Sequence, residues 1–178
     1  MKNIIAFAGS NSSQSINKKL VEFAGQSLKD IKIKVLDLND FELPIYGSDL
    51  ENEKGIPKTA NDFFNHILES DGILLSLAEH NGNYSAVFKN LFDWMSRIDG
   101  KLWSNKPMFL MATSPGGRGG TSVLEVAKAR FPYMGGNIVA EFSLPLFFDN
   151  FSDDKIVNDE FNSTFNIELQ KFINAVLD

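Results

Sequence analysis

Short apolar runs alternate along the chain with amphipathic segments of helical spacing. Five apolar runs predict β-strands, at residues 4–8, 31–36, 72–78, 108–113 and 137–144. Most of these runs are apolar at nearly every position, which is typical of strands buried on both faces of a parallel sheet. The second run begins with alternating lysines, so it fits an edge strand with one exposed face.

Five segments place apolar residues three and four positions apart, which predicts helices that bury one face. These helices are expected at residues 16–28, 57–70, 85–97, 121–131 and 157–177. Residues 41–46 predict a short apolar loop, and residues 47–58 are polar without a period and predict a surface loop. Residues 149–154 predict an acidic loop.

This alternation of strands and helices predicts an α/β fold with helices on both faces of a five-stranded parallel sheet. Right-handed crossovers leave few topologies. The strand order 2-1-3-4-5 of a flavodoxin-like three-layer α/β/α sandwich fits best. The length of 178 residues suits one domain, expected to span residues 1–178. Ligands of such sheets bind at the carboxyl ends of the strands, near the switch point between strands one and three.

The segment at residues 85–97 is apolar over an unusually wide arc. It has two adjacent apolar stripes, formed by Val87, Leu91 and Trp94 and by Phe88, Phe92 and Met95. A helix of this kind is covered on two sides, here by the sheet and either by a partner subunit or by a long loop of the same chain. We favour the dimer, because exposed apolar patches of that width are uncommon on monomers.

The composition excludes several classes of protein and site. The chain has no cysteine, which excludes disulfides, thiol catalysis and cysteine-based metal sites. Its two histidines, His66 and His80, lack the spacing of metal ligands. The net charge of -6 argues against a general nucleic-acid binder. The sequence has no charged leader before a long apolar segment and no run of about 18 apolar residues. We therefore expect a cytoplasmic protein with no membrane partner.

Hydroxyl and amide side chains follow the first strand. Gly9 permits a sharp turn or the close approach of a ligand. Serines at four of the six positions 10–15 supply hydroxyls, and the helix that begins near Ile16 adds free N–H groups and a positive dipole end. The loop predicts an anion site suited to one phosphate monoester, although the same residues are ordinary helix caps. Neither a Walker loop nor a G-x-G-x-x-G fingerprint is present here.

Two further loops fall at the same edge of the predicted sheet. Residues 78–84 are mostly polar, and residues 114–120 read Ser-Pro-Gly-Gly-Arg-Gly-Gly. So many glycines imply a backbone that curls or lies flat against another group. Each loop alone is a weak signal, because polar loops are common after strands. Their convergence indicates a phosphate cradle, a flat polar wall and a glycine platform.

As a set, these motifs resemble those of the NADPH-dependent FMN reductase family, flavodoxin-like enzymes that include azoreductases and quinone or chromate reductases. The family motif Gly-Ser-x-Arg-x-x-Ser-x-Asn corresponds to residues 9–17, and Pro-Glu-Tyr-Asn-x-Ser-x-Pro corresponds to residues 78–85. The motifs Lys-Asn-x-x-Asp-Trp, Trp-x-x-Lys-Pro and Ser-Pro-Gly-x-x-Gly-Gly match residues 89–94, 103–107 and 114–120. The resemblance covers most of the chain from Lys2 to about Leu144.

The chain departs from the family pattern at four positions. Ser12 replaces the arginine of the family's phosphate loop, which removes one positive charge from the predicted phosphate site. Ala78 and His80 replace a proline and a tyrosine, and Ser85 stands where a proline is usual. His80 keeps a flat ring but adds an ionisable imidazole. These replacements leave the nucleotide preference and the substrate open.

The resemblance implies that FMN binds at the three loops, with its phosphate at residues 10–17 and its isoalloxazine between residues 78–82 and 114–117. The implied cofactor-binding residues are Ser10, Ser12, Ser15, Ile16, Asn17, Ala78, Glu79, His80, Asn81, Gly82, Ser114, Pro115, Gly116 and Gly117. No catalytic side chain and no metal are implied, because the flavin carries the chemistry.

The resemblance further implies an oxidoreductase that passes hydride from NADPH or NADH, through FMN, to a small acceptor. Free flavin, a quinone and an azo compound are the candidate acceptors, in a ping-pong scheme, and the enzyme is expected to be a homodimer or homotetramer. One alternative is a flavodoxin-like FMN electron carrier for a protein partner, which the acidic composition would fit. The wide apolar arc at residues 85–97 counts against that carrier. Another alternative is a phosphate-ligand protein without flavin.

Overall fold

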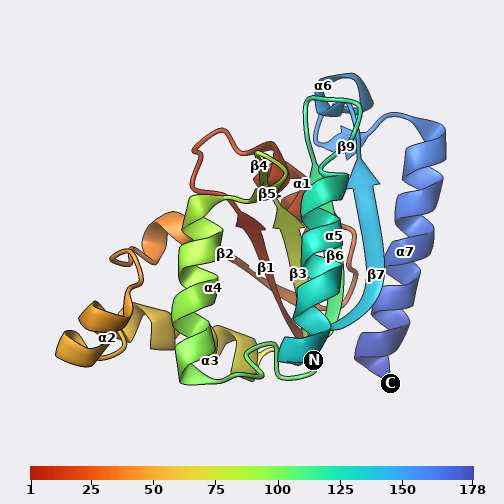
Figure 1. The fold of residues 1–178 in the computed structure, drawn as a ribbon. Helices are drawn as coiled ribbons and strands as arrows, with labels where there is room; N and C mark the ends of the chain where they lie inside the picture. The colour runs from red at the N-terminus through yellow and green to blue at the C-terminus, as the bar shows by residue number, and fades with distance from the viewer.

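Five strands form one parallel sheet in the computed structural model, which describes residues 1–178 (Figure 1). The strands are β1 (Asn3–Gly9), β2 (Lys32–Leu36), β3 (Gly72–Leu77), β6 (Pro107–Thr113) and β7 (Asn137–Leu144). Their order is β2-β1-β3-β6-β7, with β2 at one edge. This order confirms the predicted flavodoxin-like topology 2-1-3-4-5.

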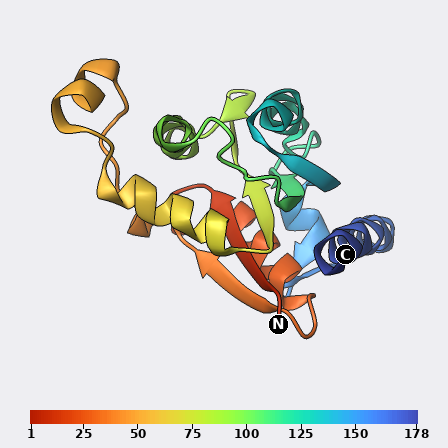
Figure 2. The same cartoon turned by 90° about the horizontal axis from the view of Figure 1, so that it is seen from below.

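Helices cover both faces of the sheet and make three layers (Figure 2). The helices are α1 (Ile16–Gln26), α3 (Lys58–Glu69), α4 (Ala86–Ile98), α5 (Thr121–Arg130) and α7 (Asp159–Leu177). Successive residues of β1 point to opposite layers. Ile5 and Phe7 join the core beneath α3, α4 and α5, whereas Ile4 and Ala6 join the core beneath α1 and α7. The apolar run of β1 therefore serves two cores at once.

A short helix, α2 (Ser48–Lys54), lies where the sequence predicts a surface loop. This helix buries none of its residues, so it leaves no apolar period to detect. Asp49 and Glu51 in its first turn favour the positive end of the helix dipole. The Arg97 guanidinium lies 3.0 Å from the Glu51 carboxylate and anchors α2 to α4. The prediction of an irregular loop is wrong, because charge at the helix ends supports this element.

The prediction of an acidic loop at residues 149–154 is also wrong. This part of the chain contains a one-turn helix, α6 (Phe147–Asn150), and a hairpin of β8 (Phe151–Ser152) and β9 (Lys155–Ile156). The hairpin turn is Asp153-Asp154, with φ of 48° and 56°. Both residues thus adopt the left-handed conformation that tight hairpin turns require, which aspartate tolerates better than most side chains.

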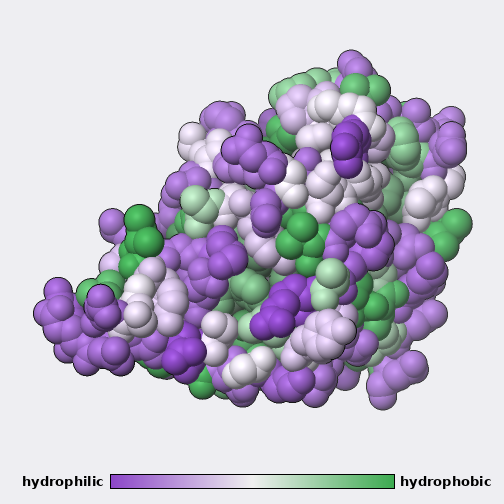
Figure 3. Space-filling model, viewed as in Figure 1, coloured by the Kyte–Doolittle hydropathy of each residue, from purple (hydrophilic) through white to green (hydrophobic).

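The wide apolar arc of α4 is covered by the chain itself. Phe88, Phe92 and Trp94 are buried, and the Trp94 indole Nε1 donates to the Pro44 carbonyl oxygen at 2.8 Å. The Tyr46 ring packs edge-on against the Trp94 ring, with centroids 5.0 Å apart. Over α4, the surface in Figure 3 is mainly hydrophilic, with only separate small apolar groups. A loop of the same chain therefore covers the second apolar stripe of α4. The width of this stripe is then no evidence for a dimer.

No helix combines the length and the continuous apolar character that a membrane-spanning segment requires.

Candidate functional site

A polar pocket of about 270 Å³ opens at the carboxyl ends of β1, β3 and β6. Its lining consists of Ser10, Ser12, Gln14, Ser15, Ile16, Asn17, Ala78, Glu79, His80, Thr113, Ser114 and Pro115. Every residue predicted from the sequence lines this pocket except Asn81, Gly82, Gly116 and Gly117. No lysine or arginine lines it, so hydroxyl groups and backbone N–H groups are the main donors that it offers to an anion.

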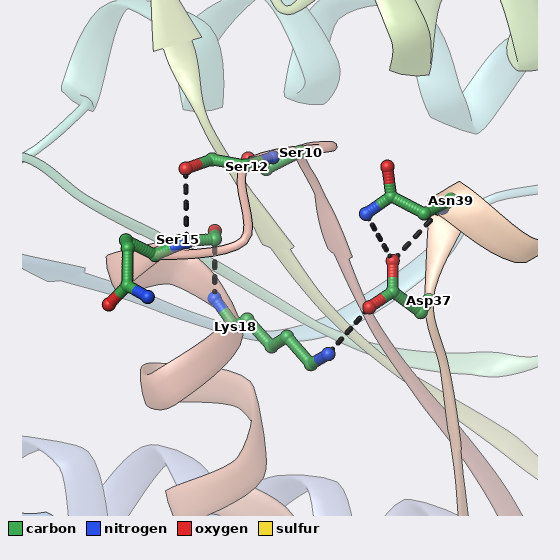
Figure 4. Close-up of polar contacts among 7 residues, drawn as sticks. Ser10, Ser12, Ser15, Lys18, Asp37 and Asn39 are labelled. Atoms are coloured by element: carbon green, nitrogen blue, oxygen red, sulfur yellow. Dashed lines mark hydrogen bonds and ion pairs between the residues drawn. The ribbon is translucent and has the colours of Figure 1, made fainter.

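The serine loop, residues 10–17, presents hydroxyl groups that are fixed in place by backbone N–H groups (Figure 4). The Oγ atoms of Ser10, Ser12 and Ser15 each accept a backbone N–H at 3.2 Å, from residues 12, 14 and 18 respectively. A hydroxyl that accepts a hydrogen bond still has its own O–H to donate. None of these three O–H groups donates to another group of the chain. The loop therefore offers three free donors.

The N-terminus of α1 adds to these donors. Ser15 is the N-cap, and the first N–H groups of the helix have no acceptor within it. These groups and the positive end of the helix dipole favour an anion. Lys18 does not neutralise an anion here, because its Nζ lies 2.6 Å from the Asp37 carboxylate (Figure 4). The hydrogen bond from Lys18 lowers the pKa of Asp37, and the same bond raises the pKa of Lys18.

The second wall of the pocket is a hairpin of β4 (Glu79–His80) and β5 (Asn83–Tyr84). Its turn is Asn81-Gly82, with φ of 53° and 74°. An Asn-Gly pair between short strands is the usual signature of such a turn, and this signal was present in the sequence. The turn carries Asn81 and Gly82 out of the pocket lining, which explains why neither residue lines it.

The two side chains of the hairpin wall have different roles. The Glu79 Oε2 accepts the Val123 N–H at 3.0 Å. This N–H belongs to the first turn of α5, which has no side-chain cap of its own at Gly120. Glu79 therefore caps α5 and fixes the hairpin to it. His80 is exposed and is the only lining residue that can carry a positive charge.

The third wall is the glycine loop, residues 114–120. Gly119 and Gly120 are buried with φ of 58° and 78°, and a Cβ atom at Gly119 would lie 2.8 Å from the Pro145 nitrogen. The backbone of the loop is pinned by the N–H groups of Leu146 and Phe147, which donate to the carbonyl oxygens of residues 116 and 114. By contrast, a Cβ atom at Gly117 would have no neighbour within 4 Å. Gly116 and Gly117 thus form an open edge beside the pocket.

Sequence reasoning missed Gln14 and Thr113 among the lining residues. Gln14 lies between two predicted serines, and its N–H donates to the Ser12 hydroxyl. Thr113 is the last residue of β6 and directly precedes the glycine loop. Both residues could have been included from their position beside predicted site residues. Asn17 differs from the other predicted residues, because its buried side chain is turned toward the strand ends.

The sequence profile of the NADPH-dependent FMN reductase family matches residues 2–149. An NADPH:quinone oxidoreductase of Arabidopsis thaliana is 32% identical over 123 residues, which cover 67% of this chain and 61% of that protein. A 2-hydroxy-1,4-benzoquinone reductase of a Burkholderia species is 32% identical over 118 residues, which cover 65% of this chain and 62% of that protein. The chain thus spans about three fifths of the length of these curated relatives.

The fold is similar to that of a solved flavoenzyme. FerB, an NAD(P)H:(acceptor) oxidoreductase from Paracoccus denitrificans, superposes with a TM-score of 0.78 at 23% sequence identity. The superposition covers 99% of this chain and 98% of the FerB chain. This likeness extends over all three layers and supports the assignment of the fold.

Proposed function

The chain belongs to the NADPH-dependent FMN reductase family of oxidoreductases, and we propose that it binds FMN in the pocket at the strand ends and reduces a small acceptor with NAD(P)H. The observation that carries this proposal is the set of three free serine O–H donors at the start of α1. A phosphate monoester fits these donors, because it is compact, anionic and rich in acceptors.

The residues present fit the phosphate of FMN without a cation. Ser10, Ser12 and Ser15 would donate their O–H groups, and the backbone N–H groups of Ile16 and Asn17 would add the helix-end contribution. Charge-assisted hydrogen bonds of this kind are stronger than neutral ones. Several of them can therefore replace the arginine that Ser12 displaces from the family pattern.

The other two walls fit a flat ring. The hairpin would support one side of the isoalloxazine through Ala78, Glu79 and His80. Ser114 and Pro115 would line another side, with Gly116 and Gly117 beside them as an edge free of side chains. When bound, FMN supplies the hydride chemistry, while the protein binds and orients the reactants. No side chain of the chain is proposed as a nucleophile or a general base.

Asn81 and Gly82 lie at the hairpin turn, outside the pocket lining. We propose that they contact the ring edge through their backbone, next to the flavin N5 region. Both residues have the left-handed backbone conformation that forms the turn. A Cβ atom added at Gly82 would have one neighbour within 4 Å, the Ser122 side chain at 3.9 Å. The turn therefore has room for a ligand that extends past the end of the pocket.

Among the candidate acceptors, a quinone has the strongest support. Relatives from a plant and a bacterium are named for quinone reduction. Because the three loops enclose a single pocket, nicotinamide and acceptor would use the same opening in turn, which predicts ping-pong kinetics. The choice between NADPH and NADH, and between a quinone and free flavin or an azo compound, is for experiment.

Steady-state kinetics of the FMN-loaded protein test this proposal. We expect double-reciprocal plots against NADPH, at several fixed concentrations of a benzoquinone, to give parallel lines. Intersecting lines would overturn the ping-pong scheme. Flavin binding without turnover of NADPH or NADH would overturn the reductase and favour the electron carrier.

The remaining expectations come from the length and composition of the chain and from its family. We propose a single domain over residues 1–178, a cytoplasmic location, and a homodimer or homotetramer. Light scattering at micromolar concentration tests the assembly, since the chain mass is 19.9 kDa. A mass of one chain would contradict the oligomer. Because the apolar arc of α4 is covered within the chain, this arc provides no evidence for the proposed assembly.

A further inference from the structure

The side chain of Asn17 forms a buried bridge between strand ends. Its exposed fraction is 4%, and its amide makes three hydrogen bonds. The Oδ1 accepts the Ser76 hydroxyl at 2.8 Å and the Thr113 N–H at 3.0 Å. The Nδ2 donates to the Thr113 carbonyl oxygen at 3.1 Å. One residue in the first turn of α1 thus holds the carboxyl ends of both β3 and β6.

The bridge continues across the sheet. The Thr113 hydroxyl donates to the Leu144 carbonyl oxygen at 2.6 Å, which adds the end of β7. Ser76 and Thr113 have exposed fractions of 0% and 1%. We call Asn17, Ser76 and Thr113 the strand-end network. Its members are buried and paired, so its geometry is strongly determined.

The network joins two walls of the pocket. Asn17 follows Ser15 by two residues, and Thr113 directly precedes Ser114. Ser15 and Ser114 line the pocket on opposite loops. The bonds of Asn17 therefore set the distance between the serine loop and the glycine loop.

We propose that Asn17 is a positioning residue, which sets the spacing between the phosphate subsite and the ring wall through its side chain and leaves contact with the phosphate to its backbone N–H. This inference rests on the proposed binding of FMN. Three of the four hydrogen bonds that the amide can make are used within the network, both at Oδ1 and one at Nδ2. One Nδ2 hydrogen remains, so the test below must separate positioning by this side chain from its direct contact with the phosphate.

The network requires a side chain at position 17 that both donates and accepts hydrogen bonds. A carboxylate at position 17 would still accept the Ser76 hydroxyl and the Thr113 N–H, but it would face the Thr113 carbonyl oxygen without a hydrogen to donate. Two acceptors in buried contact repel each other. The end of β6 would move away from α1, and the ring wall would move with it. The new negative charge would also repel a bound phosphate, so the test of positioning needs an uncharged substitution.

Two ligands separate positioning from direct contact. FMN and riboflavin share the ring and the ribityl chain, but riboflavin lacks the phosphate. A side chain that positions the two walls affects both ligands by the same factor. A side chain that touches the phosphate affects FMN alone.

The test is a titration of the full chain with FMN and, separately, with riboflavin, followed by flavin fluorescence. We expect Asn17→Ala, which removes all three bonds and adds no charge beside the phosphate, to weaken both ligands by a similar factor of about 10 or more, because small displacements in a preorganised site have large effects. Ser70→Ala is the matched control: it removes another buried hydroxyl, which donates to the Ile67 carbonyl oxygen at 2.9 Å outside the pocket lining. Both affinities should be unchanged in this control.

Three outcomes would overturn the inference. Loss of FMN affinity with riboflavin affinity preserved would show direct phosphate contact, and unchanged affinity for both would show that the bridge does not position the site. If Asn17→Ala does not fold, Ser76→Ala removes one bond of the network. This variant should weaken both ligands by the same factor, smaller than that of Asn17→Ala, and a loss confined to FMN would again contradict positioning. Absence of flavin binding by the unaltered chain would instead refute the proposed function itself.

Discussion

The serine loop and the glycine loop face the same pocket, but they are built on opposite principles. The serine loop is held by side chains, since three hydroxyls accept backbone N–H groups and keep their own hydrogens free. The glycine loop is held by backbone geometry, with positive φ at Gly119 and Gly120 and no space for side chains there. One loop thus supplies donors for a charged group, and the other supplies clearance for a flat one.

This difference predicts that the two loops fail differently when altered. A change in the glycine loop should first affect the stability of the fold. A change in the serine loop should first affect the affinity for the ligand. The predictions below test this contrast, from the largest expected effect to the smallest.

The largest effect is expected for Gly119→Ala. The new methyl group would meet the Ser143 side chain and the Pro145 nitrogen, at a φ of 58° that alanine disfavours. We expect a loss of about 2–4 kcal/mol in the free energy of unfolding, measured by urea denaturation. Gly117→Ala is the control, because nothing lies within 4 Å of its added methyl group. Equal losses in the two variants would refute the steric account of this loop.

A large effect on affinity is expected for Ser10→Asp. The added carboxylate would face the phosphate, so FMN affinity should fall by about 100-fold or more. Riboflavin affinity should be preserved, in contrast to the effect expected of Asn17→Ala. Ser10→Thr keeps the hydroxyl and serves as the control in the same fluorescence titration. Unchanged FMN affinity in Ser10→Asp would remove the phosphate from this loop.

The smallest effect is expected for Asp37→Asn, which removes the ion pair with Lys18. The pair is partly exposed, with side-chain exposures of 36% and 28%, so the loss at pH 7 should be below about 1 kcal/mol. The folded-state pKa of Asp37 is lowered from its ordinary value of 3.8. The pair therefore stabilises the fold above that value, and its contribution is lost as pH falls through the lower folded-state pKa.

Urea denaturation of Asp37→Asn from pH 7 down to pH 3 checks this sign. The difference from the unaltered chain should shrink as the medium becomes acidic. Asp62→Asn is the control, since it removes a more exposed pair with Lys58, whose side chain is 85% exposed. A difference that grows toward acid pH would contradict the assignment.

The central architecture could be predicted from the sequence, because buried parallel strands leave strong apolar runs. The run at residues 4–8 and the lysines at 32 and 34 were enough to place a central and an edge strand. The three pocket loops followed from the rule that ligands bind at strand ends. The helix α2 could not be predicted in this way, because it has no buried face.

The sequence predicts which loops form the pocket better than it predicts the contacts of individual side chains. The loops were correct, but the role of Asn17 required knowledge of its contacts with Ser76 and Thr113, which are 59 and 96 positions away. The cover of α4 by Pro44 and Tyr46 likewise depends on contacts 50 residues apart for the Trp94 indole. Local pattern contains no information about such pairs, and this is why a helix covered by its own chain was assigned to a dimer.

The central claim is that the pocket at the strand ends holds FMN in a state that NADPH can reduce. The most direct test is the absorbance spectrum of the protein with one equivalent of FMN, titrated without oxygen first with NADPH and then with a benzoquinone. The account predicts that NADPH bleaches the bound flavin and that the quinone restores its colour. Bound flavin that neither NADPH nor NADH bleaches, or no bound flavin at all, would contradict it.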